Sequence, residues 1–287
     1  MPELPEVETM CRGISGIVGS RIVAAERPEC FRRPILFTPA IAEFAQRAVG
    51  RHVASIGRRG KRVLIHLDDL QTIVIEPRMT GLVLLTAPPT TEHLRLRLQL
   101  KGGPAEELLF WDRRGLGTVR LLSPSEADQV LGLHRIGADA LQITLAGLRE
   151  QLGGSRRPIK VALLDQKRIA GVGNLYAAEI LHVAGVDPRT RCDALTGPQW
   201  ARIHKAISIV LLEAIDHEGS TLSDGTYRNA LNQNGGYQNL HRVYDRADEL
   251  CRRCGEGQIQ RIVQAQRSTF FCAVCQRRKG LHPTVDI

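Results

Sequence analysis

Residues 61–85, KRVLIHLDDLQTIVIEPRMTGLVLL, carry three short apolar runs separated by the charged and turn-forming residues Asp-Asp and Pro-Arg-Met-Thr. Runs of this length, rich in Val, Ile and Leu and bounded by turn residues, are typical of β-strands. Runs of the same kind flank them on both sides, at residues 21–26, 52–57, 94–100, 107–112 and 117–122. Only residues 41–49 read as a helix among them, so crossover helices are missing. We therefore expect mainly antiparallel pairing and a two-layer β-sandwich.

The segment in front of these strands has the pattern of an amphipathic helix. Its apolar residues recur at helical spacing until Gly19, at positions Leu4, Val7, Cys11, Ile14 and Val18. Pro5 suits a first helical turn, where the backbone N–H that proline lacks has no partner within the helix. The sequence thus predicts a helix over residues 4–18 ahead of the β-sandwich.

The pattern of apolar and polar residues changes after about Leu122. The residues SPSEADQ read as a polar connector, and helical periodicity follows at residues 144–152, 158–165, 172–184 and 198–217. The second and third of these helices are joined by the glycine-bearing turn QKRIAG, which resembles a helix-turn-helix with a long turn. A polar segment at 220–236 is long enough that we expect it to be mobile or functional. The predicted class is α+β, with domains at 1–135, 136–246 and 247–287.

Charge indicates what kind of partner the protein binds. The 287 residues include 39 Lys and Arg against 30 Asp and Glu, a formal net charge of +9, and the sequence pI is about 9.5. This balance favours a polyanionic partner, although a basic protein without such a role remains open. No apolar run approaches the roughly 18 residues of a membrane span. The acidic N-terminus lacks the features of a secretory signal, so we expect a cytosolic protein.

Two Cys-x-x-Cys pairs near the end of the chain predict a metal site. The sequence CRRC is followed by seventeen residues and then CAVC, which supplies Cys251, Cys254, Cys272 and Cys275. This spacing is typical of a structural zinc ion bound by four thiolates, with a β-hairpin between the two pairs. A closed four-sulfur site has no open position, so we expect this zinc to have no catalytic role. The other cysteines (Cys11, Cys30 and Cys192) are scattered and expected to be reduced, structural thiols.

Three motifs in this order, MPELPEVET, GVGNLYAAE and CRRC…QRSTFFCAVCQ, resemble those of the formamidopyrimidine-DNA glycosylase family. The resemblance covers essentially the whole chain. It implies an N-terminal antiparallel β-sandwich with a leading helix, a C-terminal helical domain with a helix-two-turn-helix element, and a zinc-ribbon hairpin. The implied activity is excision of oxidised purines from double-stranded DNA, with cleavage of the strand at the abasic site. We expect a monomer with one structural Zn²⁺, in the cytoplasm and associated with the nucleoid through DNA.

The resemblance also implies the catalytic residues. If Met1 is removed, Pro2 presents a secondary amine that can attack the sugar C1′ and form an iminium ion. Glu3 is placed to protonate the ring oxygen as the sugar opens. Lys61 and Arg267 match the family residues that contact the lesion phosphate and assist the first and second eliminations. Without the resemblance, Pro2 and Glu3 would read as ordinary residues of a helix start, and Lys61 as solvated surface.

Other matches point to contacts with DNA. Met79, Arg114 and Leu116 correspond to the residues that fill the gap left by an extruded nucleotide, and the segment 220–236 to the loop that closes over it. This sequence departs from the family at Leu116, where phenylalanine is usual, at Gly115, where arginine is usual, and in the EPR before Met79. Backbone contacts are expected from an asparagine at a helix start and from three basic side chains, namely Asn174, His93, Arg156 and Lys160.

Two other functions compete with this interpretation. The missing phenylalanine leaves open an activity on oxidised pyrimidines, as in the related endonuclease VIII enzymes. A protein that only binds damaged DNA would use the zinc ribbon and the helical element without cutting the strand. Excision rates on 8-oxoguanine and thymine glycol, together with strand scission, distinguish the three.

Overall fold

The computed structural model describes residues 2–222, 225 and 227–277. The chain forms two compact units. The first unit combines Met1–Arg135 with Ala214–Gln238, and the second combines Ile136–Glu213 with Asn239–Ile287. Among the described residues, no helix combines the length and the apolar character needed to cross a bilayer.

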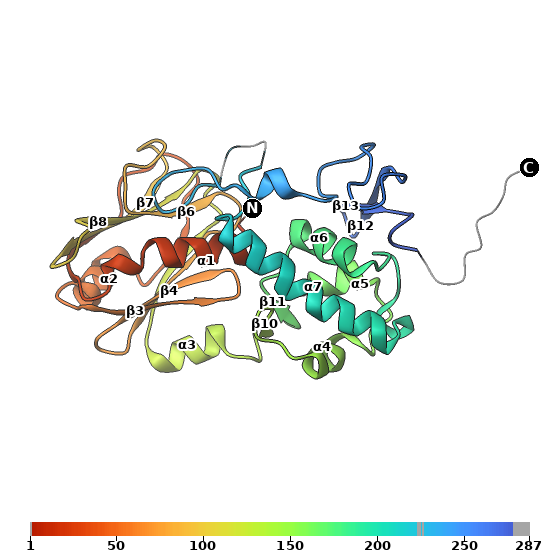
Figure 1. Ribbon diagram of the computed structural model, residues 1–287. Coiled ribbons are helices and arrows are strands. Elements are labelled where there is room, and N and C mark those ends of the chain that lie inside the picture. Colours follow the sequence, from red (N-terminus) through yellow and green to blue (C-terminus); the bar gives the residue numbers. More distant parts are fainter. Residues whose placement is uncertain (1, 223–224, 226, 278–287) are drawn as a thin grey trace, which may run out of the picture. The chain divides into compact units, whose positions relative to one another are not determined.

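The first unit contains two β-sheets, as the strand pattern predicts (Figure 1). One sheet has the strand order β1-β7-β8-β6 and is antiparallel throughout. Its strands are β1 (Arg21–Glu26), β6 (Gly81–Leu84), β7 (Leu94–Lys101) and β8 (Glu107–Asp112). The order places β6 beside β8, so the turns at the ends of these two strands lie near each other.

The second sheet has the order β2-β9-β5-β4-β3. Its strands are β2 (Leu36–Thr38), β3 (Val53–Arg59), β4 (Arg62–Leu67), β5 (Thr72–Glu76) and β9 (Thr118–Leu122). All pairs are antiparallel except that of β2 with β9. The sequence did not predict β2, because its three residues are too few to show an alternating pattern.

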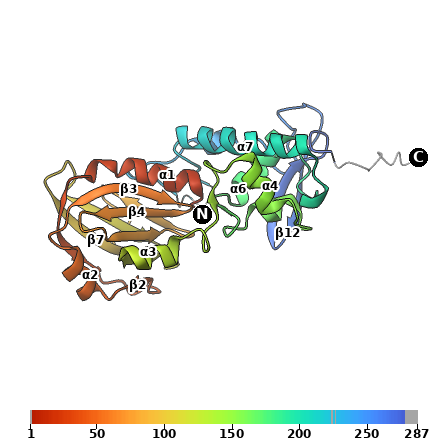
Figure 2. The same ribbon diagram turned by 90° about the horizontal axis from the view of Figure 1, so that it is seen from below.

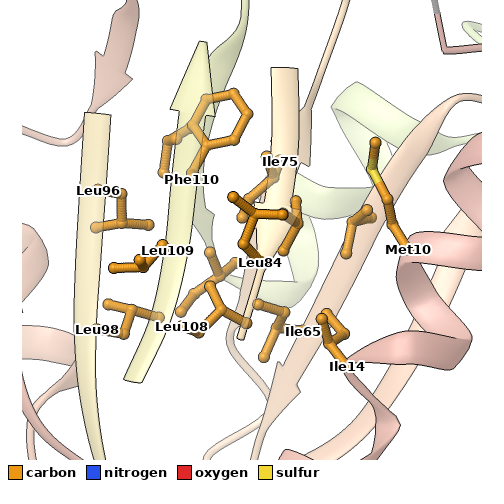
Figure 3. Packing of buried hydrophobic residues seen from close by; sticks show 14 of the residues in the cluster. Met10, Ile14, Ile65, Ile75, Leu84, Leu96, Leu98, Leu108, Leu109 and Phe110 are labelled. Carbon is orange, nitrogen blue, oxygen red and sulfur yellow. The ribbon is translucent and has the colours of Figure 1, made fainter. Parts of the chain in front are cut away.

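The two sheets enclose one hydrophobic core (Figure 3). Leu96, Leu98 and Phe110 of the first sheet face Ile65 and Ile75 of the second, and all five are less than 2% exposed. Burial of this much apolar surface is the main favourable term in folding the unit. The predicted antiparallel β-sandwich is therefore confirmed.

Helix α1 (Leu4–Gly13) runs alongside β3 and β4 (Figure 2). Its fully buried side chains include Val7 and Met10, and Cys11 donates its S–H to the carbonyl oxygen of Gly57 in β3, at 3.2 Å. The predicted extension of this helix to Val18 was wrong. Gly13 packs so close to Ala230 that an added Cβ would lie 2.5 Å from the alanine Cβ. A short 3₁₀ turn, Ser15–Ile17, continues the chain instead.

A second correction concerns the predicted polar connector after Leu122, which contains a helix, α3 (Pro124–Leu131). Ser123 and Glu126 form a capping box at its start, and Pro124 occupies its first position. Both helix-start signals are present in the sequence. The segment has no apolar face with helical periodicity, however, since none of its residues is fully buried. Another helix of this unit is α2 (Ile41–Ala48), as predicted.

The second unit is mostly helical (Figure 1). Its helices are α4 (Leu145–Leu152), α5 (Ile159–Leu163), α6 (Asn174–Ala184) and α7 (Gly197–Asp216), whose last residues belong to the first unit. A short parallel pair, β10 (Ala138–Asp139) with β11 (Ile169–Ala170), was not predicted. The antiparallel hairpin β12 (Ile259–Gln264) and β13 (Arg267–Cys272) packs with β13 against α6. The α+β class with a C-terminal zinc-ribbon hairpin is confirmed.

Candidate active site and zinc centre

The N-terminal segment is held by a buried carboxylate. Glu6, only 2% exposed, accepts hydrogen bonds from the backbone N–H of Glu3 at 2.8 Å and of Ser220 at 2.9 Å. Glu3 is itself 3% exposed and directly precedes α1, next to the buried Pro2. Because donors from both chain segments meet on one side chain, Glu6 fixes the position of the Pro2–Glu3 peptide relative to Ser220.

Ser220 opens the segment 220–236 that the sequence singled out, and Tyr227 gives it a second attachment. The Tyr227 hydroxyl donates to the carbonyl oxygen of Glu6, at 3.4 Å. Burial and the negative charge of Glu6 raise the pKa of Tyr227 well above its usual value, so the phenol stays protonated as a donor. Residues 223, 224 and 226 of this segment, like Met1, lie outside the described residues.

Lys61 lies in the tight turn between β3 and β4, after Gly60 with its positive φ of 56°. Arg58 fixes this turn to α1. Its Nε donates to Glu8 at 2.8 Å and its Nη1 to the carbonyl oxygen of Gly60 at 3.0 Å. Burial tends to raise the pKa of Glu8, but hydrogen bonds from Arg58 and Arg12 outweigh it and lower the pKa. A charged Glu8 therefore holds the lysine-bearing turn beside the N-terminal helix.

The residues predicted to fill the gap in DNA lie in two turns. Met79 belongs to the turn between β5 and β6, whereas Arg114 and Leu116 belong to the turn between β8 and β9. Arg114 is exposed and Leu116 half-buried. Gly115 adopts a φ of +62°, and an added Cβ would lie 2.3 Å from the carbonyl oxygen of Arg33. The local backbone therefore explains why this chain has glycine at position 115.

His93 is 8% exposed and begins the segment that leads into β7. Its ring packs edge-on against Trp111, and its Nε2 lies 2.8 Å from a carboxylate oxygen of Glu92. Burial lowers the pKa of His93. The imidazole is thus held in a fixed orientation by its neighbours.

In the second unit, two of the candidate residues come together. The Nζ of Lys160 donates to Oδ1 of Asn174 at 2.5 Å, and the Nδ2 of Asn174 donates to the carbonyl oxygen of Ser268 at 3.0 Å. Lys160 is completely buried, and Ser268 directly follows Arg267. Sequence reasoning expected Lys160 to contact DNA itself, but the structure places its amine against Asn174. Arg156 is exposed in the segment before α5.

Arg267 follows a strained turn. The hairpin connection consists of Ala265 and Gln266, with φ values of +46° and +61°. Two-residue hairpins favour positive φ at both positions, but normally place Asn and Gly there. Arg267 is exposed beside this turn, at the first position of β13. The hairpin thus presents a guanidinium to solvent on a short, well-defined backbone.

The four cysteines fit a structural zinc ion. Their Sγ atoms all lie within 4.8 Å of one another, with 3.8 Å between Cys251 and Cys275 and between Cys254 and Cys272. Zn–S bonds of about 2.3 Å in a tetrahedron require sulfur atoms about 3.8 Å apart. The backbone N–H of Gly257 donates to Cys254 and helps to lower the pKa of its thiol to about 6. The donor set and spacing match a closed four-thiolate site.

A histidine that sequence reasoning missed lies next to this cluster. The Nε2 of His182, near the end of α6, is 3.4 Å from Sγ of Cys251. Burial lowers the pKa of His182 to about 4, so the ring is neutral and can donate one N–H to a thiolate. Arg253 also donates to the carbonyl oxygen of His182, at 2.9 Å. These contacts attach the first cysteine pair to α6.

Sequence reasoning also missed two buried carboxylates that organise backbone. Glu6 had a detectable signal, because it stands three residues after Glu3 at the start of a helix, the spacing of a capping box. Glu179 accepts the backbone N–H groups of Arg242, Val243 and Tyr244 at 2.8 to 2.9 Å. Those three residues lie more than 60 positions away, so no local pattern could indicate the contact.

Comparison with known proteins places the two units in one family. The model of the formamidopyrimidine-DNA glycosylase N-terminal domain matches residues 1–119, and that of the formamidopyrimidine-DNA glycosylase H2TH domain matches residues 136–226. The model of the zinc finger found in FPG and IleRS matches residues 248–278. A formamidopyrimidine-DNA glycosylase of Chloroflexus aurantiacus is 41% identical, over 96% of this chain and 98% of its own length.

Solved structures agree with the sequence comparison. A Lactococcus lactis Fpg bound to DNA with an abasic site has a TM-score of 0.84 and 31% identity, and a variant of it bound to Fapy-dG DNA has the same values. Both alignments cover 96% of this chain and 100% of the Lactococcus lactis chain. The similarity extends over both units and includes the zinc finger. This chain therefore belongs to the formamidopyrimidine-DNA glycosylase family.

Proposed function

We propose that this protein is a bifunctional DNA glycosylase and abasic-site lyase that removes oxidised purines in base excision repair. The observation that carries the proposal is the buried Pro2–Glu3 peptide fixed by Glu6, in a chain that matches the family over 96% of its length. The relatives bound to Fapy-dG DNA and to abasic-site DNA support both parts of the activity. The substrate class is double-stranded DNA with a damaged base or an abasic site.

The proposed chemistry begins at the amine of Pro2, once Met1 has been removed. Amino termini titrate at about 7.7–8.0, so an appreciable fraction of the amine is unprotonated at neutral pH. Its lone pair forms a bond to C1′ while the bond from C1′ to the base breaks, and the base leaves with that electron pair and takes up the proton that the Pro2 nitrogen then loses. The lone pair returned to this nitrogen forms the C=N bond as the C1′–O4′ bond breaks, and Glu3 gives a proton to the ring oxygen. The product is an iminium ion on the secondary amine.

The positive iminium withdraws electrons and makes the C2′ proton acidic. Loss of that proton expels the 3′ phosphate, and a second elimination expels the 5′ phosphate. Lys61 assists the first step and Arg267 the second, because each can neutralise charge on a phosphate that leaves. Asn174, at the N-terminus of α6, binds a backbone phosphate with its amide, at the positive end of the helix dipole.

The zinc ion, when bound, supplies folding energy to the β12–β13 hairpin that carries Arg267. The three proposed domains are residues 1–135, 136–246 and 247–287, and the domain-model matches at 1–119, 136–226 and 248–278 support this division. We propose that the protein acts as a monomer in the cytoplasm, on the nucleoid. A fluorescent fusion at the C-terminus, imaged in living cells, checks the location.

Borohydride trapping tests the central step. Protein with a verified Pro2 terminus is incubated with duplex DNA that contains 8-oxoguanine, and reduction should give a covalent protein–DNA adduct whose sugar is attached to the Pro2 nitrogen. Peptide mapping by mass spectrometry identifies the attachment. An adduct at another side chain, or none, contradicts the mechanism.

A lesion panel tests the substrate. We expect faster excision of 8-oxoguanine and formamidopyrimidines than of thymine glycol. The opposite order would favour an enzyme for oxidised pyrimidines, and tight binding without strand scission would favour a protein that only binds damage. Mass spectrometry of the N-terminus in the same preparation separates a blocked amine from a wrong assignment.

A further inference from the structure

One buried carboxylate connects the two turns that carry the gap-filling candidates. Asp112, the last residue of β8, is 0% exposed. Its Oδ2 accepts the backbone N–H groups of Leu116 at 2.8 Å and of Gly117 at 2.7 Å, and its Oδ1 accepts that of Arg114 at 3.2 Å. The whole β8–β9 turn is therefore folded around the side chain of Asp112.

The second turn reaches the same carboxylate through Thr80. Thr80 is 3% exposed, directly follows Met79 and directly precedes β6. Its hydroxyl donates to Oδ1 of Asp112 and accepts the backbone N–H of Arg114 at 2.9 Å. The hydroxyl thus uses both its donor and its acceptor capacity to join the turn after β5 to the turn after β8.

The sheet and the Gly115 backbone limit how either turn can move. Gly81 and Asp112 are direct partners in the β6–β8 ladder, so the two turns begin at neighbouring positions of one sheet. On the other side, the close approach of Gly115 to the carbonyl oxygen of Arg33 leaves no room for a side chain at position 115. Hydrogen bonds to a buried carboxylate are also stronger than those between neutral groups.

We propose that Thr80 and Asp112 are positioning residues that hold Met79, Arg114 and Leu116 as one rigid unit, so that these side chains enter the base stack together. This inference rests on the proposed function. Taking a nucleotide out of the duplex is energetically unfavourable because stacking and pairing are lost, and ordered side chains must occupy the gap to offset that loss. The Thr80–Asp112 pair therefore sets how efficiently a base is extruded and how strictly the opposite base is read.

The test compares two near-isosteric substitutions at one position. Thr80→Val keeps the shape but removes the hydroxyl, whereas Thr80→Ser keeps the hydroxyl. Each variant is assayed in single turnover on 8-oxoguanine opposite cytosine, on 8-oxoguanine opposite adenine and on a preformed abasic site. Misplacement of a reacting group by a small distance can lower a rate by about 100-fold, so we expect Thr80→Val to lose about 10- to 100-fold on 8-oxoguanine opposite cytosine.

Two readouts separate positioning from a general loss of structure. An abasic nucleotide leaves the stack at little cost, so Thr80→Val should cleave the abasic site at nearly the wild-type rate. The preference between cytosine and adenine opposite the lesion should narrow, and Thr80→Ser should restore both the rate and the preference. Asp112→Asn should also act more slowly on 8-oxoguanine than on the abasic site relative to wild type, with a larger loss of rate on 8-oxoguanine than Thr80→Val shows.

An equal loss on base lesion and abasic site would overturn the proposal, as would a Thr80→Ser variant no better than Thr80→Val. Fluorescence of 2-aminopurine beside the lesion gives an independent check, since Thr80→Val should slow the rise that reports base extrusion. The wild-type protein answers the separate question of function. If it acts on neither 8-oxoguanine nor abasic sites, the proposed function itself is refuted.

Discussion

The Nζ of Lys160 lies 2.5 Å from the Oδ1 of Asn174, and both side chains donate to the carbonyl oxygen of Ser268, at 3.4 and 3.0 Å. A lysine that is 0% exposed requires such partners, because an isolated buried charge is costly. The contact fixes the amide of Asn174 at the start of α6 and joins α5, α6 and β13. Lys160 therefore orients Asn174, the residue proposed to bind a backbone phosphate.

Replacing Lys160 by methionine should weaken DNA binding by disordering Asn174. It should also lower the free energy of unfolding by about 1–3 kcal/mol, because buried acceptors lose a donor. Fluorescence anisotropy with duplex DNA and urea unfolding measure the two effects. Lys205→Met is the matched control, since Lys205 is exposed on α7 and the change in charge is identical. If both substitutions weaken DNA binding equally, the loss of one positive charge explains the effect and the contact with Asn174 does not.

Replacing Glu3 by glutamine should leave DNA binding intact but slow base excision. General acid catalysis contributes about 10²–10⁴-fold, so we expect a loss within that range in single-turnover excision of 8-oxoguanine. Glutamine has nearly the same size, and the backbone N–H at position 3 can still donate to Glu6. Thermal unfolding serves as the check on structure. A variant with unchanged excision would remove Glu3 from the mechanism.

Removal of zinc should abolish tight DNA binding while the β-sandwich stays folded. Cys254→Ser breaks the metal site, and elemental analysis should find one zinc per wild-type chain and almost none in the variant. Cys192→Ala is the control, because Cys192 is a buried cysteine of the same unit outside the cluster. Limited proteolysis should cut the variant within residues 248–277. Full DNA affinity without metal would contradict a structural role.

Stability should fall in mildly acidic solution because of His241. Burial, followed by the charges of Arg246, Arg242 and Arg252, lowers the pKa of this histidine to about 4. In the unfolded chain the pKa of this histidine is about 6.5. Between pH 4 and 6.5 the unfolded state therefore binds more protons than the folded state, so stability is lost as pH falls through this window. The maximum loss is about 3 kcal/mol for one such group.

Urea unfolding at pH 7 and pH 5, with excess zinc, measures this effect. His241→Gln should reduce the dependence without abolishing it, because the buried His182 also has a pKa lowered to about 4. His134→Gln should leave the dependence unchanged, because His134 is exposed. If the free energy of unfolding falls equally between pH 7 and pH 5 in the wild type and in His241→Gln, His241 does not cause the loss of stability.

The sequence predicted those parts of the structure that leave local patterns. The runs around Ile65, Ile75 and Phe110 indicated strands because both faces of the sandwich bury apolar side chains. The cysteine spacing indicated the metal site for a similar reason, since two short motifs carry all four ligands. Helix α3 was missed because it has no buried apolar face, although its capping box was detectable in the sequence.

The site was predicted less completely, because its organisation depends on contacts between distant residues. Pro2 and Glu3 could be named, but not the role of Glu6, whose partner Ser220 is 214 positions away. Lys160 was named for its charge, and only the fold shows that its amine faces Asn174. In each case a buried polar group had to find partners, and topology rather than sequence spacing decided which.

The shared acceptor at Glu6 has a kinetic consequence. The amide hydrogens of Glu3 and Ser220 are both protected by the same carboxylate. Deuterium should therefore enter both amides together whenever this carboxylate swings away, even though the chain between them contains most of the protein. Trapping the sugar on the N-terminus would slow that exchange at Ser220 as well, so a label far along the polypeptide would report the chemical state of its first atoms.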